Sequence, residues 1–163
     1  MIFTHPRAAL TLDDATLYPG FLFGARPGHG LDESFEQGPS IEGNIVVSTD
    51  MFGYQRQLTD PAHRGHILVM ATPQIGNVGW NDHDNHPDNP DGSITAAGIV
   101  IRDLSVAVSH YNATRSLAEA MIAQGVTGIA GVDTRSLIRR ITRAADPQEQ
   151  VARIIVDTQR ARG

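Results

Sequence analysis

The sequence predicts a mixed α/β domain, and three observations support this prediction. Short apolar and β-branched runs, separated by turn residues, indicate several strands in the first hundred positions. The order then becomes strand, helix, strand, helix, which is typical of a mixed architecture. The length of 163 residues favours a single domain, 1–163, that can bury a core without disulfides or metals.

The chain begins with a predicted hairpin, in which residues 8–12 and 16–18 are the strands and 13–15 the turn. The range 26–42 then mixes glycine, proline and acidic residues, and we predict an inserted surface loop there, with a short helical turn near 32–35. A loop of this length is unusual inside a compact domain. It is either a mobile insertion, which we favour, or a contact loop.

Further strands are predicted before the helices. The run 67–72 is continuously apolar, as expected of a strand covered on both faces, and Pro73 ends it. The other elements predicted here are strands at 44–48 and 96–102, a glycine-punctuated turn at 75–79 and a solvated polar loop at 81–92.

Two amphipathic helices follow. Thr114 to Gln124 is the clearer one, with Thr114 as the N-cap and Gly125 at the C-terminal cap. After a predicted strand at 126–132, Asp133 is expected to cap the second helix. Its apolar face comprises Leu137, Ile138 and Ile141, and its other face carries Arg135, Arg139, Arg140 and Arg143. We interpret the arginines as a solvated face, with a docking face for a partner as the alternative.

The C-terminal segment 147–160 allows two interpretations. Pro147 and Glu149 suit the first turn of a helix. The β-branched run at 154–156 instead favours a strand at 151–156, which is our prediction.

Composition excludes several classes of function. The chain has no cysteine, so disulfides, thiolate metal sites and a cysteine nucleophile are excluded, and a reducing cytoplasm is the expected location. The net charge of −5 opposes general nucleic-acid binding. We expect no membrane span and no secretion signal, because no apolar stretch is long enough and the first seven residues lack an apolar core.

The histidines are the obvious candidates for chemistry. Asp82, Asp84 and His86 imitate the start of a calcium loop, but Pro87 stands where glycine is needed and Ser93 where glutamate is needed. His63 and His66 flank a turn, yet nothing nearby in the sequence completes a site with them or with His83. The glycine pair in 76–79 fits a tight turn better than a nucleic-acid grip. We therefore predict no metal site and no cofactor, and rank an independent histidine enzyme lowest.

Four stretches in series match one known family. They are Leu10–Gly20; Met51–Gln55 with Leu58–Pro61; Pro73–Gly79 with Asn81-Asp82; and Ala97–Asp103 with Gly128–Arg135. The third reads Pro-Gln-Ile-Gly-Asn-Val-Gly, against a family pattern of Pro-x-Ile-Gly-Asn-x-Gly. With these motifs the chain resembles the N-terminal domain of the small, glutamine-hydrolysing subunit of carbamoyl phosphate synthetase.

This resemblance implies a fold and a role. The fold would be a three-layer β/β/α domain of the swivelling type. The role would be docking to the large subunit, in support of glutamine hydrolysis and ammonia delivery for arginine and pyrimidine biosynthesis. In the family a glutamine amidotransferase domain follows, and we expect it to be absent here. The alternative is a stand-alone binding or regulatory module without enzymatic activity.

The resemblance also names site residues. Ala62 stands where the family has a serine that contributes to the glutamine site, so a hydroxyl contact is lost and only a backbone contact remains available. Tyr54 and Trp80 are expected to be interface anchors, so that Trp80→Ala would weaken large-subunit binding and leave the fold intact. A homodimer through an exposed apolar patch is a further expectation.

Overall fold

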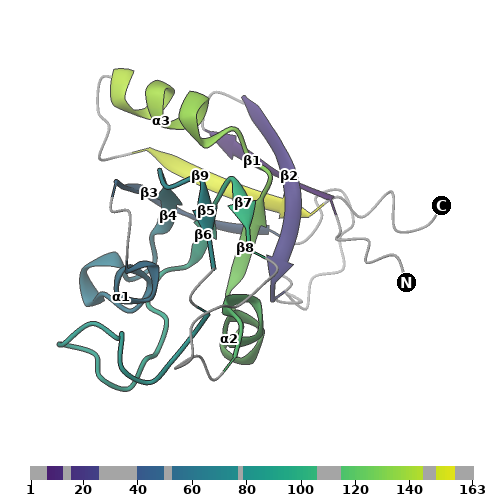
Figure 1. Ribbon diagram of the computed structural model, residues 1–163. Coiled ribbons are helices and arrows are strands. Elements are labelled where there is room, and N and C mark those ends of the chain that lie inside the picture. Colours follow the sequence, from purple (N-terminus) through teal and green to yellow (C-terminus); the bar gives the residue numbers. More distant parts are fainter. Residues whose placement is uncertain are drawn as a thin grey trace, which may run out of the picture.

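Seven strands of the computed structural model close into a barrel (Figure 1). The structure describes residues 7–12, 16–25, 40–49, 53–76, 79–105, 115–144 and 150–156. Around the barrel the strands are β1 (Arg7–Leu12), β2 (Leu17–Gly24), β8 (Thr127–Ala130), β6 (Gly98–Val100), β4 (Ile67–Met70), β3 (Ser40–Ser48) and β9 (Val151–Val156). The strands β5 (Gln74–Ile75) and β7 (Asp103–Leu104) form a separate parallel pair. The helices are α1 (Tyr54–Leu58), the 3-10 helix η1 (Pro61–His63), α2 (Leu117–Gln124) and α3 (Thr134–Arg143).

The barrel mixes two kinds of strand pairing. β3, β4, β6 and β8 are parallel neighbours, whereas β1, β2 and β9 complete the ring with antiparallel pairs. Parallel neighbours need a crossover between them. These crossovers are α1 with η1 between β3 and β4, the segment 79–97 between β4 and β6, and α2 between β6 and β8. The prediction of a mixed α/β domain is therefore confirmed.

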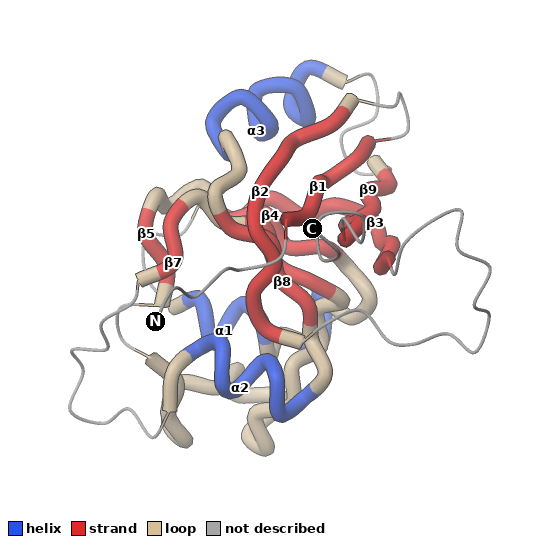
Figure 2. The backbone as a smooth tube through the Cα atoms, turned by 90° about the vertical axis from the view of Figure 1, so that its right-hand side faces the viewer, coloured by secondary structure: helices blue, strands red, loops and turns tan. Residues whose placement is uncertain are grey.

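The parallel strands separate two hydrophobic cores. On β4, Ile67 and Val69 belong to one core, while Leu68 and Met70 point into the other. The first core includes Leu137 and Ile141 of α3. The second includes residues of α1 and α2. Accordingly, α3 lies on one side of the strands and α1 and α2 on the opposite side (Figures 1 and 2).

Several predicted elements are confirmed. The strands of the hairpin are β1 and β2, and all four residues of β4 are buried, as the apolar run at 67–72 predicted. Asp133 caps α3, its carboxylate accepting the Ser136 N–H at 3.1 Å. Val151–Val156 form strand β9, as predicted, so the helical alternative is wrong for these residues; 147–149 and 157–160 lie outside the described part.

Several boundaries need correction. The strands predicted at 67–72, 96–102 and 126–132 are shorter, as β4, β6 and β8, and β4 ends at Met70 before Pro73 is reached. Ser40–Glu42 are not part of a loop but of β3, where they pair with β9; residues 26–39 lie outside the described part. Helix α2 begins after Ser116, whose hydroxyl accepts the Glu119 N–H at 3.1 Å, so the N-cap is not Thr114. Gln74–Ile75 extend into β5 before the glycine turn, because β7 offers them a partner.

None of the described helices is both long enough and apolar enough to cross a membrane.

Tyr18 links the barrel to α3. It lies on β2 in the first core, with 9% of its surface exposed. Burial raises the pKa of the Tyr18 phenol, the hydrogen bond with Ser136 lowers it, and the charge of Asp133 raises it, with a net increase. The phenol therefore stays protonated as a hydrogen-bonding group throughout the neutral range.

This raised pKa predicts a loss of stability at alkaline pH. An unfolded tyrosine releases its proton near about pH 10, whereas folded Tyr18 keeps it to higher pH. Above that value the folded state binds more protons, so the free energy of unfolding falls as the pH rises. Urea unfolding of the wild type and Tyr18→Phe from about pH 8 to 11 measures this effect. The wild type should lose more stability over that range, and parallel curves would contradict the assignment.

Candidate functional site

The family-like motifs at 51–61 and 73–82 meet in one polar region on the α1 side of the barrel. We call it the polar corner and define it as residues 53–66 and 79–97. It begins at Gly53, which has a φ of 82°, a left-handed conformation that glycine adopts without strain. Helix α1 follows directly and ends at Leu58, with Thr59 as its C-cap. Asp60 then caps η1, its carboxylate accepting the Ala62 N–H at 2.9 Å.

Gln55 joins the two segments of the corner. Its Nε2 donates to the Asn81 carbonyl oxygen at 2.5 Å and lies 2.7 Å from Asn85 Oδ1. Its Oε1 accepts the Asn81 N–H at 3.1 Å. Both Gln55 and Asn81 are buried. A buried backbone segment without regular structure needs such partners. The Gln55 side chain therefore bonds the backbone N–H and C=O of Asn81, as a neighbouring strand would in a sheet.

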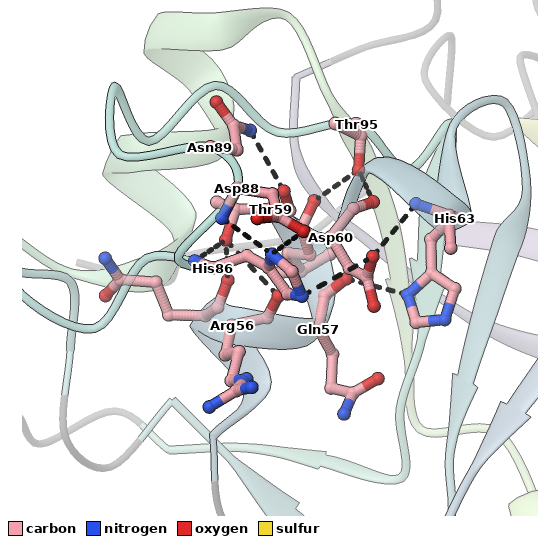
Figure 3. A network of polar contacts seen from close by, with 12 residues as sticks. Arg56, Gln57, Thr59, Asp60, His63, His86, Asp88, Asn89 and Thr95 are labelled. Atoms are coloured by element: carbon pink, nitrogen blue, oxygen red, sulfur yellow. Dashed lines mark hydrogen bonds and ion pairs between the residues drawn. The ribbon is translucent and has the colours of Figure 1, made fainter.

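Thr59 makes a second connection (Figure 3). Its hydroxyl donates to the Gln55 carbonyl at 2.8 Å and accepts the His86 N–H at 2.8 Å. The Asn89 amide donates to the Thr59 carbonyl at 2.9 Å. The Thr95 hydroxyl lies 2.5 Å from the Asp60 carbonyl oxygen. The segment 79–97 is thus attached to the turn at Thr59 and Asp60 by three of its residues, His86, Asn89 and Thr95.

Asn81 organises the loop from its other end. Its Oδ1 accepts the N–H groups of His83 and Asp84 at 2.7 and 2.8 Å, and its Nδ2 donates to the Asp84 carboxylate at 2.7 Å. Such an Asx turn explains why Asp84 faces Asn81. The predicted solvated loop is therefore half right, because its acidic side chains are exposed while its first residue is buried.

The histidines occupy separate positions in the corner. His63 Nδ1 lies 2.8 Å from the Gln57 carbonyl oxygen, and His66 Nδ1 lies 3.1 Å from that of Arg64. His86 Nδ1 accepts the Asp88 N–H at 3.1 Å, and its Nε2 lies 3.8 Å from Asp60 Oδ1. Within the described residues no three histidine, aspartate or glutamate side chains gather as a metal site would require.

Ala62 lies on the exposed turn that the corner supports, in η1. Because its N–H is bonded to Asp60, the carbonyl oxygen is the backbone group it can offer a ligand. In the part of the chain that the structure describes, every buried side-chain nitrogen and oxygen has a hydrogen-bond partner. The buried polar side chains of the corner are thus all hydrogen-bonded, and together they support the exposed turn that carries Ala62.

Tyr54 and Trp80 lie inside the chain, with 4% and 2% of their surfaces exposed. Both belong to the second core. The Tyr54 hydroxyl donates to the Gly79 carbonyl, and the backbone N–H of Trp80 donates to the Arg115 carbonyl at 2.8 Å. In this conformation neither side chain can reach a partner. Because Trp80 is part of the core, we expect Trp80→Ala to destabilise the fold rather than leave it intact.

Sequence reasoning missed the contributions of Gln55, Thr59 and Asn81. The one available signal was Asn81 at the head of a polar loop, because asparagine often bonds backbone N–H groups two or three residues later. Nothing in the sequence pairs Gln55 with Asn81, since this contact depends on the packing of α1 against the loop.

Comparison with known proteins identifies relatives. Residues 10–151 match the family described as carbamoyl-phosphate synthase small chain, CPSase domain. The carbamoyl phosphate synthase small chain of Corynebacterium efficiens is 47% identical over 82% of this chain, and that of Mycobacterium leprae is 40% identical over 84%. The chain spans about a third of the length of these relatives, 30% and 33% respectively. Among solved structures, an aminopeptidase from Aneurinibacillus sp. strain AM-1 aligns with 94% of the chain and 31% of its own, with a TM-score of 0.49 and 15% identity. That likeness is too weak to support an argument.

Burial of Trp80 predicts that Trp80→Ala destabilises the fold. Removing a fully buried indole leaves a cavity and costs about 3–5 kcal/mol. Guanidinium unfolding of the two proteins measures the loss. Ile122→Ala is a suitable control, because Ile122 is 60% exposed and should change stability by less than about 1 kcal/mol. Equal stability of Trp80→Ala and the wild type would show that the indole is not in the core.

The Gln55 contacts predict a second, more local effect. Gln55→Leu leaves the buried Asn81 N–H and C=O without their partner, which should cost about 2–4 kcal/mol. Amide hydrogen exchange should also accelerate at 81–85, because the loop loses its attachment. Arg56→Gln, an exposed change on the same helix, is the matched control. Unchanged exchange in Gln55→Leu would mean that other contacts hold the loop.

Proposed function

This chain belongs to the carbamoyl phosphate synthase small chain family, and we propose that it is the N-terminal docking domain of such a small chain. In that role it holds the small chain against the large chain and supports glutamine hydrolysis and ammonia delivery. The observation that carries this proposal is the family match over residues 10–151, which includes the barrel strands β2, β3, β4, β6 and β8 in full and the whole polar corner.

The composition agrees with a supporting role. The chain contains no cysteine, so a cysteine nucleophile for glutamine hydrolysis belongs to an amidotransferase domain outside these residues. We also propose the finer fold assignment that the family implies, a three-layer β/β/α swivelling domain. A cytoplasmic location is part of the same proposal.

Ala62 is the proposed point of contact with the glutamine site. The turn that carries it is exposed and capped by Asp60. A serine hydroxyl is missing at this position, and the N–H is engaged, so the Ala62 carbonyl is the group left to accept a hydrogen bond from a ligand. The polar corner would then serve to keep this turn in place.

Tyr54 and Trp80, the expected interface anchors, are covered by this chain itself, which supports a docking surface formed by other residues. We further propose self-association through β2, where two large apolar side chains are exposed, Leu17 to 62% and Phe21 to 49%.

Isothermal titration of this chain with the cognate carbamoyl phosphate synthase large chain tests the docking role. We expect saturable binding with a Kd in the micromolar range or tighter, about −8 kcal/mol or stronger. An unrelated acidic protein of similar size serves as the control for non-specific heat. Absence of binding by a chain that circular dichroism shows to be folded would overturn the proposal.

A further inference from the structure

His86 has a different neighbour at each of its two ring nitrogens (Figure 3). The backbone N–H of Asp88 donates to His86 Nδ1 at 3.1 Å. A ring nitrogen that accepts a hydrogen bond carries no proton, so the neutral imidazole holds its proton on Nε2. This nitrogen lies 3.8 Å from Asp60 Oδ1. The surroundings of His86 therefore select one tautomer of the neutral ring.

Protonation of the ring is incompatible with the contact at Nδ1. Both nitrogens of an imidazolium are donors, so Nδ1 and the Asp88 N–H would then be two donors facing each other. The Asp88 carboxylate is the acceptor nearby, because its Oδ2 lies 3.9 Å from Nδ1. The charged ring thus favours a rearranged turn, in which the side chain of Asp88 replaces its backbone as the partner of Nδ1.

Two carboxylates face the ring, one from each segment of the polar corner. Asp60 caps η1, and Asp88 belongs to the same loop as His86. The side chain of Asp88 is 81% exposed, so it can turn toward the ring without unpacking the core. Arg56, the charged residue of α1, points away from the ring in Figure 3. His63, the other titratable group beside Asp60, has its Nδ1 2.8 Å from a backbone carbonyl of α1.

The charge of His86 can reach the turn that carries Ala62 through one oxygen atom. Asp60 Oδ1, which lies nearest to His86 Nε2, also accepts the Ala62 N–H at 2.9 Å. An imidazolium attracts this oxygen more strongly than a neutral ring does, and so competes with the Ala62 N–H for it. The backbone of His86 stays fixed to the end of α1, because its N–H donates to the Thr59 hydroxyl at 2.8 Å.

We propose that His86 is a proton-responsive switch, which rearranges the turn at Asp88 and shifts the Ala62 turn when its ring takes up a proton. Histidine is the side chain that ordinarily changes charge between about pH 5 and 8. Nδ1 takes the proton from solvent, its bond from the Asp88 N–H breaks, and the new N–H donates to the Asp88 carboxylate. The switch goes beyond the docking role, because it needs no partner and belongs to this chain alone.

An NMR titration of the chain from about pH 8 to 5 tests the switch. The Asp88 amide proton should move upfield as its hydrogen bond is lost, with the same midpoint as the His86 ring signals. The Ala62 amide should shift with that midpoint too. H86Q, which cannot take up the proton, should lose both shifts. H63Q/H66Q is the matched control, because it removes the two histidines next to Ala62 and should keep both shifts.

Each outcome supports or overturns the inference. An Asp88 amide that stays in place while the His86 ring titrates would show that this contact does not depend on the ring charge. Persistence of both shifts in H86Q would assign them to another group. An Ala62 amide that no longer moves in H63Q/H66Q would show that the switch does not reach this turn.

D88N guards against a folding defect in H86Q. The change is on an exposed side chain and keeps the backbone N–H that Nδ1 accepts. Its transition should begin at a lower pH than that of the wild type, because the charged ring loses one of its two carboxylates. An unchanged transition would mean that the Asp88 carboxylate takes no part, and the proposed exchange of partners would be wrong.

Discussion

The whole structure depends on burying both faces of the parallel strands. All residues of β4 are buried, and they alternate between the two hydrophobic cores. A parallel sheet is stable in water only when both faces are covered. Closure of the barrel together with α3 covers one face, and α1, α2 and the segment 79–97 cover the other. The segments that connect the parallel strands therefore also cover the second face of these strands.

This constraint accounts for the polar corner. A long crossover with little regular structure must pack against the sheet while its buried backbone groups still find partners. Gln55 and Thr59 provide those partners from α1 and its end, and Trp80 fills the space beneath. The need to cover the sheet and to satisfy buried polar groups together explains why Gln55, Thr59, Trp80 and Asn81 are buried. The rest of the corner, including the Ala62 turn and the loop aspartates, is largely exposed or half-buried.

The same layering places two groups of charged side chains on opposite sides of the strands. The exposed aspartates of the corner, including Asp82, Asp84 and Asp88, lie on one side of the strands, and the arginines of α3 lie on the other (Figures 1 and 2). Such an asymmetric distribution orients an approaching charged partner. In the docking role proposed above, one side would bind a partner while the other supports a site.

Local signals in the sequence were enough to predict four elements: the buried strand β4, the hairpin of β1 and β2, the Asp133 cap of α3 and the strand β9. Its motifs also determined the family. Only the tertiary structure decided that the strands close into a barrel, that Ser40–Glu42 join β3, and that Gln55 bonds Asn81 across the corner. It likewise decided that Tyr54 and Trp80 are internal. The reason is physical: turn chemistry and periodicity act over a few residues, whereas pairing and burial depend on which distant segments the fold brings together.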